Sequence, residues 1–456
     1  MQIRIILLIS IITSTDLLAA SLIDIVNIAK ENNLSLKSSE KSYQASQYDI
    51  DIHRSKFLPS LSLRADSTWN ENKKFQTTDQ HIINDYNSNS YSLSLSQNIF
   101  NLTDIYTIES TQIDVDISEL QTIKTEQRII KEAAVKYFDY LKNNSQIKAT
   151  EAEFISSESR FIHMRRNIQL GNTAGSEIYE VIAQKENTKN KLLTLKKERK
   201  VILNDLYNIT QDNKTPSYDL NKLSTFPKIE EHREIFLKNT LFQLNLDILI
   251  SKKQLKKSKQ KIKETASSFS PTLTGDISYR KDNTNNPSDN SPPNFGISES
   301  VVYSINFDLP LSSGGRDIYK YRKNNIEYEK SHLDLMQSGE DSIQQFYNYI
   351  ENINDYSRSL ETYTIIIKAN YSSYNGIKKA HKLGTRTITD LLSAESKLFN
   401  SIRDYENARY NYIIEIINLN ELIGLLNDYF IKDIMSDMLP ITNDLSSSPI
   451  PLHLIK

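Results

Sequence analysis

The side chains whose types and spacing suggest chemistry gather in two short turns of this sequence, 170–177 and 383–390. Each turn has a glycine and then a hydroxyl followed by a carboxylate: Gly171, Ser176 and Glu177 in the first, and Gly384, Thr389 and Asp390 in the second. A glycine ends a helix in the left-handed conformation, while a hydroxyl and an acid satisfy the free N–H groups and the dipole at the start of the next helix. Helix capping is the simplest interpretation of both turns, and a further role requires that the turns face each other.

No enzymatic motif accompanies these turns. The seven histidines are scattered without an H-E-x-x-H pattern, and neither a P-loop nor a G-x-S-x-G elbow occurs. The absence of cysteine excludes disulfides, iron–sulfur ligands and an acylated lipoprotein terminus. Gly314 and Gly315 are explained by a turn between a strand and a helix. We expect no catalytic residue, no metal and no cofactor, and the near balance of 55 basic and 57 acidic side chains indicates no nucleic-acid partner.

The first twenty residues, 1–20, have the pattern of a secretory signal peptide. Arg4 precedes an apolar stretch, and Ala19 and Ala20 offer a cleavage site of small residues. We expect the mature chain to start near Ser21. No later segment approaches the ~20 apolar residues that a membrane helix needs, so any segment that crosses a membrane must be a β-strand.

The rest of the chain contains an internal duplication. Three stretches recur 212 residues further on: 33–36 matches 245–248, 57–61 matches 269–273, and 91–95 matches 303–307. A common offset over so long a stretch indicates a repeated structural unit rather than chance similarity. We interpret 21–225 and 226–430 as two structural repeats and 431–456 as a C-terminal tail.

Each repeat contains two short segments in which apolar and polar residues alternate. We expect these segments to be strands at about 59–69, 90–99, 271–280 and 299–311. In the first, Leu61, Leu63 and Trp69 alternate with polar residues, whereas Ser67 and Gly275 interrupt the apolar face of their segments. About ten residues with one apolar and one polar face are typical of a strand that separates lipid from water.

The strand pairs are joined by polar stretches, 70–90 and 281–298, with the length and composition of exposed loops. A half-buried hairpin of a soluble protein has the same alternation and is an alternative. Four strands cannot close a barrel, and open sheet edges cannot lie in lipid. A membrane protein of this kind must therefore oligomerise, with eight strands from two copies or twelve from three.

A long helical hairpin follows each strand pair, at about 101–209 and 316–426. The stretch 102–168 lacks glycine and proline, and at ~1.5 Å per residue a helix of this length would extend about 100 Å. The last helix has a heptad seam with members at every seventh position: Leu391, Leu398, Tyr405, Tyr412, Leu419 and Leu426. Small residues between them permit helices to pack around a hollow. The alternative is a solid rod, as in a secreted coiled-coil structural or adhesive protein without a pore, which would not need detergent for extraction.

Together these features resemble the TolC family of outer-membrane efflux and secretion channels. The closest likeness lies in the stretch LGTRTITDLLSA at 383–394 and in NARYNY at 407–412. The strand pairs that begin at Pro59 and Pro271, with the duplicated layout, extend the resemblance over nearly the whole mature chain.

The resemblance implies an α+β membrane protein that forms a homotrimer. Twelve strands, four from each chain, would form a β-barrel in outer-membrane lipid and continue into a periplasmic coiled-coil tunnel, with a mixed belt drawn from 211–228 and the residues after Asn427. The implied partners are a periplasmic adaptor, which would dock at the tunnel tip near Gly171 and Gly384, and an inner-membrane pump or ABC exporter. Those partners would decide the cargo and whether the duct serves efflux or protein secretion.

The resemblance also assigns roles at the tip of the tunnel. By position, Arg386 would bond near Ser176, and Asp390 would contribute to a ring of three carboxylates that attracts cations. Two positions depart from the family pattern. His381 stands where a family member has a tyrosine bonded to an acid, here Glu177, and Ser393 stands where a second ring aspartate is expected.

Overall fold

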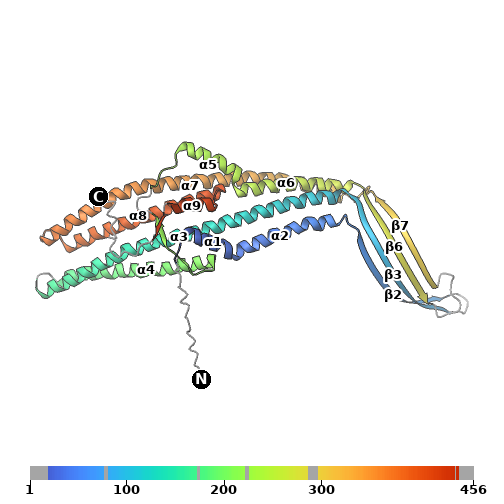
Figure 1. Ribbon diagram of the computed structural model, residues 1–456, viewed down its shortest axis with the longest axis horizontal. Helices are drawn as coiled ribbons and strands as arrows, with labels where there is room; N and C mark the ends of the chain where they lie inside the picture. The colour runs from blue at the N-terminus through green and yellow to red at the C-terminus, as the bar shows by residue number, and fades with distance from the viewer. Residues whose placement is uncertain are drawn as a thin grey trace, which may run out of the picture. The chain divides into compact units, whose positions relative to one another are not determined.

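In this computed structural model the described residues are 19–75, 81–171, 175–220, 225–285, 296–436 and 438–440 (Figure 1). The chain divides into two compact units. The first comprises 1–40, 121–249 and 338–456, and the second comprises 41–120 and 250–337. Of the predicted signal peptide, residues 1–18 lie outside the described part of the chain, as does the tail from residue 441.

The second unit contains a four-stranded antiparallel sheet in the order β2-β3-β6-β7. Its strands are β2 (Ser60–Phe75), β3 (His81–Asn101), β6 (Thr272–Asn285) and β7 (Gly296–Asp308). Thus β2 and β7 are the edge strands, and the strand pairs of the two repeats meet where β3 pairs with β6 (Figure 1).

The register places most of the apolar residues of the four strands on one face, with Val302 an exception on the other. One row across the sheet consists of Leu61, Leu95, Ile277 and Tyr303. Many side chains of this face are open to the surroundings, and Leu63 and Tyr303 are each 75% exposed. Gly275 interrupts the face because a bulge in β3 brings Ile99 over it: a Cβ at Gly275 would lie 3.3 Å from Ile99 Cδ1.

Three strands are longer than the alternation predicted, whereas β7 has the expected length but lies about three residues earlier in the chain and ends at Asp308 rather than at 311. The expected limits near residues 69, 90, 280 and 299 are wrong, because the ladder continues to Phe75 in β2, begins at His81 in β3, continues to Asn285 in β6 and begins at Gly296 in β7. Much of the sequence assigned to loops is therefore strand. Ladder hydrogen bonds join backbone groups, so polar side chains can extend a strand beyond the point where its apolar face ends.

Each strand pair is preceded by two short helices and followed by two long ones. In the first repeat these are α1 (Leu22–Asn32), α2 (Leu34–Ser55), α3 (Leu102–Gln169) and α4 (Ile178–Thr210). In the second they are α5 (Glu231–Leu244), α6 (Leu246–Ala266), α7 (Arg316–Lys382) and α8 (Ile388–Ile423). The five predicted heptad positions from Leu391 to Leu419 lie in α8 and are all buried, which confirms the seam, whereas Leu426 is buried but lies beyond the end of α8 at Ile423.

The same asparagine device breaks the short helices in both repeats. Asn33 Oδ1 accepts the N–H of Ser35 at 2.9 Å, and its Nδ2 donates to the Ile209 carbonyl at the end of α4 at 3.2 Å. Asn245 Oδ1 accepts the N–H of Ile248 at 2.8 Å, and its Nδ2 donates to the Leu422 carbonyl at the end of α8 at 2.7 Å. Each asparagine therefore starts one helix and holds the end of another, and we refer to these two residues as the asparagine staples.

A small belt of mixed structure forms from the segments that the resemblance implied, together with Ala19 and Ala20, which the sequence assigned to the signal peptide. In it β1 (Ala19–Ala20) pairs in parallel with β4 (Thr215–Pro216), and β5 (Tyr218–Leu220) pairs with β8 (Met438–Pro440), which follows α9 (Asp428–Ser436). Buried Tyr410 and Arg409 hold this belt through Asp219 Oδ1 at 2.7 Å and the Leu220 carbonyl at 2.6 Å. Burial opposes the charge of Arg409, but the neighbouring Glu406 carboxylate contributes to raising its pKa above the usual value, so the guanidinium stays charged.

None of the described helices combines the length and the apolar character that a membrane-crossing helix requires.

Candidate functional site

The two glycine turns adopt the backbone conformation that the sequence predicts. Gly171 and Gly384 have φ angles of 75° and 74°, in the left-handed region that ends a helix. After the second glycine, the N–H of Thr385 donates to the Ala380 carbonyl at 3.0 Å, which satisfies a carbonyl of the last turn of α7.

The second turn is a connected network of side chains. Thr387 caps α8 by accepting the N–H of Asp390 at 3.1 Å, and the Asp390 carboxylate accepts the N–H of Thr387 at 3.2 Å. Arg386 Nη1 lies 3.8 Å from Asp390 Oδ2, and His381 Nδ1 lies 3.0 Å from the Arg386 carbonyl oxygen. The structure thus brings together the three charged or ionisable residues predicted in this turn, although Arg386 and Asp390 are exposed and water screens their attraction.

The first turn is less constrained. Ser176 and Glu177 belong to a 3₁₀ turn (Gly175–Glu177), and Glu177 stands at the cap position of α4 without a side-chain capping bond. Within the described residues of one chain, no hydrogen bond or ion pair joins Arg386 to Ser176 or His381 to Glu177. Those contacts remain predictions.

A different contact joins the second turn to the start of α4: Thr389 Oγ1 donates to Glu180 Oε2. Glu180 was not among the residues predicted from the sequence, although an acid in the first turn of α4 was a signal for it. Beside this bond the ends of α3, α4 and α8 share a small apolar cluster, against which Tyr374 and Ile377 of α7 pack: Met164, Val181, Ile388, Leu391 and Leu392. The glycine turns therefore lie near each other within one unit, as a further role for them requires.

A buried ionic network ties the two repeats together further along the same helices. Arg403 Nη1 on α8 donates to Glu153 Oε2 on α3 at 2.7 Å, and the two side chains are only 7% and 5% exposed. In the same way Arg160 on α3 lies 2.5 Å from Glu395 on α8. Sequence reasoning missed this network because heptad patterns count apolar residues, and buried charges on partner helices leave no local signal.

The network also affects a neighbouring lysine. Burial lowers the pKa of Lys191 on α4, and the positive charge of Arg403 lowers it further. Arg403 is thus the charge that neutralises Glu153 and also the one that repels Lys191. We name Glu153, Arg160, Glu395 and Arg403 the ionic quartet, and we conclude that it fixes α8 against α3.

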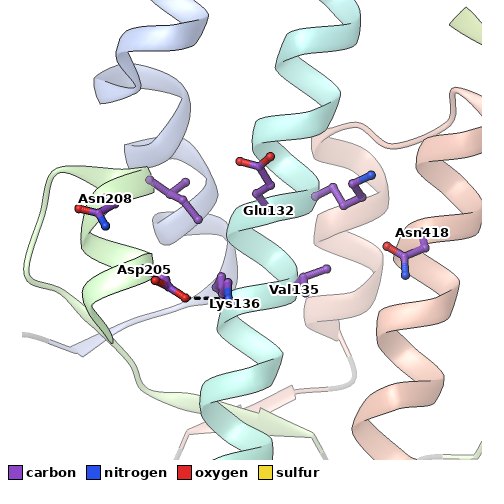
Figure 2. Close-up of a pocket in the computed structure, with 8 residues that line it drawn as sticks. Glu132, Val135, Lys136, Asp205, Asn208 and Asn418 are labelled. Carbon is purple, nitrogen blue, oxygen red and sulfur yellow. Dashed lines mark hydrogen bonds and ion pairs between the residues drawn. The ribbon is translucent and has the colours of Figure 1, made fainter. Parts of the chain in front are cut away.

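A hollow of about 410 Å³ lies on the described surface between α3, α4 and α8 (Figure 2). Figure 2 shows Lys136 and Asp205 joined across it, with a distance of 2.8 Å between Nζ and Oδ2. Lys131, which also lines it, pairs with Glu421 at 3.1 Å. Both lysines that line the hollow are thus paired with carboxylates.

Metal binding finds no support in the described part of the chain, where no group of three or more histidine, cysteine, aspartate or glutamate side chains is arranged to hold an ion.

Comparison with known proteins gives consistent matches over most of the chain. The model of the family described as "Outer membrane efflux protein" matches residues 25–210 and 237–425, which is one match in each repeat. The chain is 24% identical over 435 residues to outer membrane protein TolC of Escherichia coli strain K12, covering 94% of this chain and 85% of the relative. It is 23% identical to outer membrane protein TolC of Vibrio cholerae, covering 91% and 93%.

Solved structures share the fold at lower identity. The Campylobacter jejuni CmeC outer membrane channel superposes with a TM-score of 0.74 at 16% identity, covering 91% of this chain and 89% of that one. The outer membrane protein VceC of Vibrio cholerae superposes with a TM-score of 0.72 at 13% identity, covering 88% and 96%. At these identities the likeness describes the fold.

Proposed function

This chain belongs to the Outer membrane efflux protein family, and from that premise we propose that it is the outer-membrane exit duct of a tripartite efflux or type I secretion system. The duct receives cargo in the periplasm and releases it outside the cell. Energy and cargo selection come from the partners, and the duct itself catalyses no reaction.

The observation that carries this proposal is the open sheet with an exposed apolar face. Four strands with β2 and β7 as free edges leave backbone groups unpaired, and lipid offers no water to satisfy them. Three copies that pair β7 of one chain with β2 of the next give twelve strands without an edge, and their apolar face then contacts lipid.

Native mass spectrometry of detergent-solubilised protein tests this assembly. We expect a trimer that requires detergent for extraction. A stable monomer in lipid, or a protein released from cells by salt alone, would contradict the proposal and favour the coiled-coil rod.

We further propose that the partners are a periplasmic adaptor protein, which docks at the glycine turns, and an inner-membrane pump or ABC exporter. The clustering of both turns in one unit supports this assignment, since a single adaptor surface can then contact Gly171 and Gly384 together. Crosslinking from a cysteine placed at Glu180, in a chain that has no other cysteine, should capture the adaptor in cells. Capture that is equally efficient from a cysteine at Lys259, near the sheet, would argue against docking at the turns.

The second turn is proposed as the gate of the duct. In a trimer Asp390 occurs three times around the axis, and three carboxylates attract multivalent cations. Arg386, which now pairs with Asp390 in its own chain, supplies the opposite charge that can bond across to the first turn.

Planar-bilayer recording tests the gate. Asp390→Ala should weaken block by multivalent cations, and Arg386→Ser should raise single-channel conductance. The matched control is Arg358→Ser, which removes an exposed arginine paired with Asp355 elsewhere on α7. If conductance and cation block are unchanged in correctly assembled trimers, the turns are helix caps and nothing more.

A further inference from the structure

The helices that adjoin the second strand pair are strongly basic. The 21-residue helix α6, which leads into β6, carries lysines along its length: Lys252, Lys253, Lys256, Lys257, Lys259, Lys261 and Lys263. Those with exposed side chains include Lys259 and Lys263, which lie four residues apart and so share one face of the helix.

The first two turns of α7, which follows β7, combine basic, aromatic and apolar side chains. All but one of the residues from Arg316 to Lys323 are exposed, among them Ile318 at 51% and Tyr319 at 68%. The Arg322 guanidinium lies 5.9 Å from the centre of the Tyr319 ring. Exposed aliphatic and aromatic groups beside lysine and arginine are typical of protein segments at a membrane–water interface.

These two basic segments lie side by side at the end of the apolar face of the sheet. Asn324 Nδ2 on α7 donates to Thr265 Oγ1 on α6 at 2.5 Å, so the segments are neighbours within the second unit. The apolar face continues to the junctions of strand and helix, where Leu311 is 90% exposed and Phe269 is 48% exposed. The basic segments of α6 and α7 therefore begin where the exposed apolar face of the sheet ends.

The spacing matches the dimensions of a bilayer. At ~1.5 Å per helical residue, Lys263 and Lys320 lie about 4–6 Å along their helices from the helix ends nearest the sheet, and Lys259 lies about 10 Å from that end of α6. The polar headgroup layer on each side of the hydrocarbon core is about 5–8 Å thick. If the apolar face of the sheet lies in hydrocarbon, Lys263 and Lys320 fall in the adjoining headgroup layer, and Lys259 reaches it from just beyond through its long side chain.

Several basic residues of these helices are already paired, and others are not. Lys253 bonds Asp116 at 2.7 Å and Lys257 bonds Asp114 at 2.6 Å, which holds α6 against α3. In contrast, Lys259, Lys263 and Lys320 make no ion pair with any described residue: all three are exposed and remain available to an anion.

We propose that Lys259 and Lys263 on α6 and Lys320 on α7 bind the headgroups of anionic phospholipids in the leaflet on the helix side of the membrane. The inference rests on the proposed function, which places the sheet in the outer membrane. Tyr319 and Ile318 contact the upper acyl chains while the ammonium groups bind the headgroup phosphates. The site anchors the channel at a fixed depth, and it comes from the second repeat alone.

The chain provides a convenient probe because it contains no cysteine. Ser312→Cys places one fluorophore at an exposed position in the turn between β7 and α7. The labelled trimer is reconstituted in nanodiscs, and quenching by spin-labelled phosphatidylglycerol is compared with quenching by spin-labelled phosphatidylcholine. We expect phosphatidylglycerol to associate about five- to tenfold more strongly, and this preference to fall as salt screens the charges.

The test variant is Lys259→Gln/Lys263→Gln/Lys320→Gln, in which the preference should fall to about onefold. The matched control is Lys368→Gln/Lys379→Gln/Lys397→Gln, which removes three exposed lysines from α7 and α8 far along the chain from the strands and should keep the preference. Equal quenching by the two lipids in the unsubstituted chain overturns the proposal, as does a preference that survives in the test variant.

Native mass spectrometry of the same samples separates lipid binding from subunit contact. A trimer that stays intact in the test variant while losing bound phosphatidylglycerol supports the site. A test variant that dissociates into monomers, while the control stays trimeric, assigns these lysines to a contact with a second copy and overturns the lipid assignment. A monomeric unsubstituted chain instead overturns the proposed function on which the site rests.

Discussion

The two repeats end their last helices in the same left-handed conformation but with different residues. The cap of α4 is Gln211, with φ of 52°, whereas the cap of α8 is Gly424, with φ of 90°. A Cβ at Gly424 would lie 2.4 Å from the Leu244 carbonyl oxygen, because the chain between α5 and α6 passes directly against it. The left-handed conformation alone still accepts a residue with a side chain, as Gln211 shows. At Gly424 the Leu244 carbonyl leaves no room for a β-carbon, so the second repeat is the more tightly packed at this point.

The repeats also differ where they meet their glycine turns and their strands. The second turn has a complete capping box and the first has none. Near the sheet, α3 carries acids such as Asp114 and Asp116, whereas α6 carries the lysines that pair with them. Duplicated units thus keep the staples that shape the fold and diverge in the side chains that join them to each other and to their surroundings.

The largest expected effect concerns Glu153 and Arg403, the buried ion pair that joins the two repeats. Arg403→Met leaves the Glu153 carboxylate buried without its partner, and we expect a loss of about 3–5 kcal/mol in the free energy of unfolding. Thermal unfolding of the detergent-solubilised protein measures it. Arg358→Met, at an exposed ion pair, serves as the control and should cost under about 1 kcal/mol.

The double variant Glu153→Leu/Arg403→Met sharpens this test. Replacing a buried ion pair by apolar side chains of similar size is often neutral, so most of the lost stability should return. A double variant as unstable as Arg403→Met would show that the pair is not the cause.

The next effect contrasts the two helix caps. Gly424→Ala should cost about 2–4 kcal/mol, because a β-carbon adds a clash with the Leu244 carbonyl to the strain of a positive φ. Gln211→Gly should stabilise the protein slightly, by under about 1 kcal/mol, since glycine relieves the strain at φ of 52°. Both are measured by the shift in the midpoint of thermal unfolding. Equal changes in stability at the two positions would show that the close approach of the Leu244 carbonyl does not distinguish Gly424 from Gln211.

A smaller effect tests what the repeats share. Asn33→Ala and Asn245→Ala each leave helix N–H groups and a carbonyl without partners, and each should cost about 1–3 kcal/mol. Asn208→Ala, at an exposed position on α4, is the control and should change stability by under about 0.5 kcal/mol. A cost confined to one staple would indicate that only one repeat depends on this device.

The smallest effect compares the two turns. Thr387→Ala removes the side-chain cap of α8 and should cost about 1 kcal/mol, whereas Ser176→Ala should cost close to zero because no side-chain cap is present at the start of α4. Amide hydrogen exchange in the first turns of α4 and α8 resolves the two changes. Faster exchange in α4 of Ser176→Ala would contradict this and show that Ser176 caps α4 through a bond that forms only in the assembled protein.

Patterns with a short period determine much of this protein from its sequence. The seam from Leu391 to Leu419 is buried as the heptads predict, the apolar faces of the four strands coincide, and Gly171 and Gly384 end their helices. The reason is physical: the side-chain period of a helix or a strand is set by local backbone geometry, so residues a few positions apart report which face is buried. Because the sequence is duplicated, the order of helices and strands predicted for the first repeat also predicted their order in the second.

Contacts between distant residues were decided only by the tertiary structure. Glu153 and Arg403 lie on separate helices 250 residues apart, and nothing in either helix indicates the other. In the sheet Ile99 fills the space above Gly275 through a bulge that alternation does not show. Such pairings depend on how helices rotate and slide against one another and on where a ladder shifts its register. These quantities are set by the packing of the whole chain, because no local period contains them.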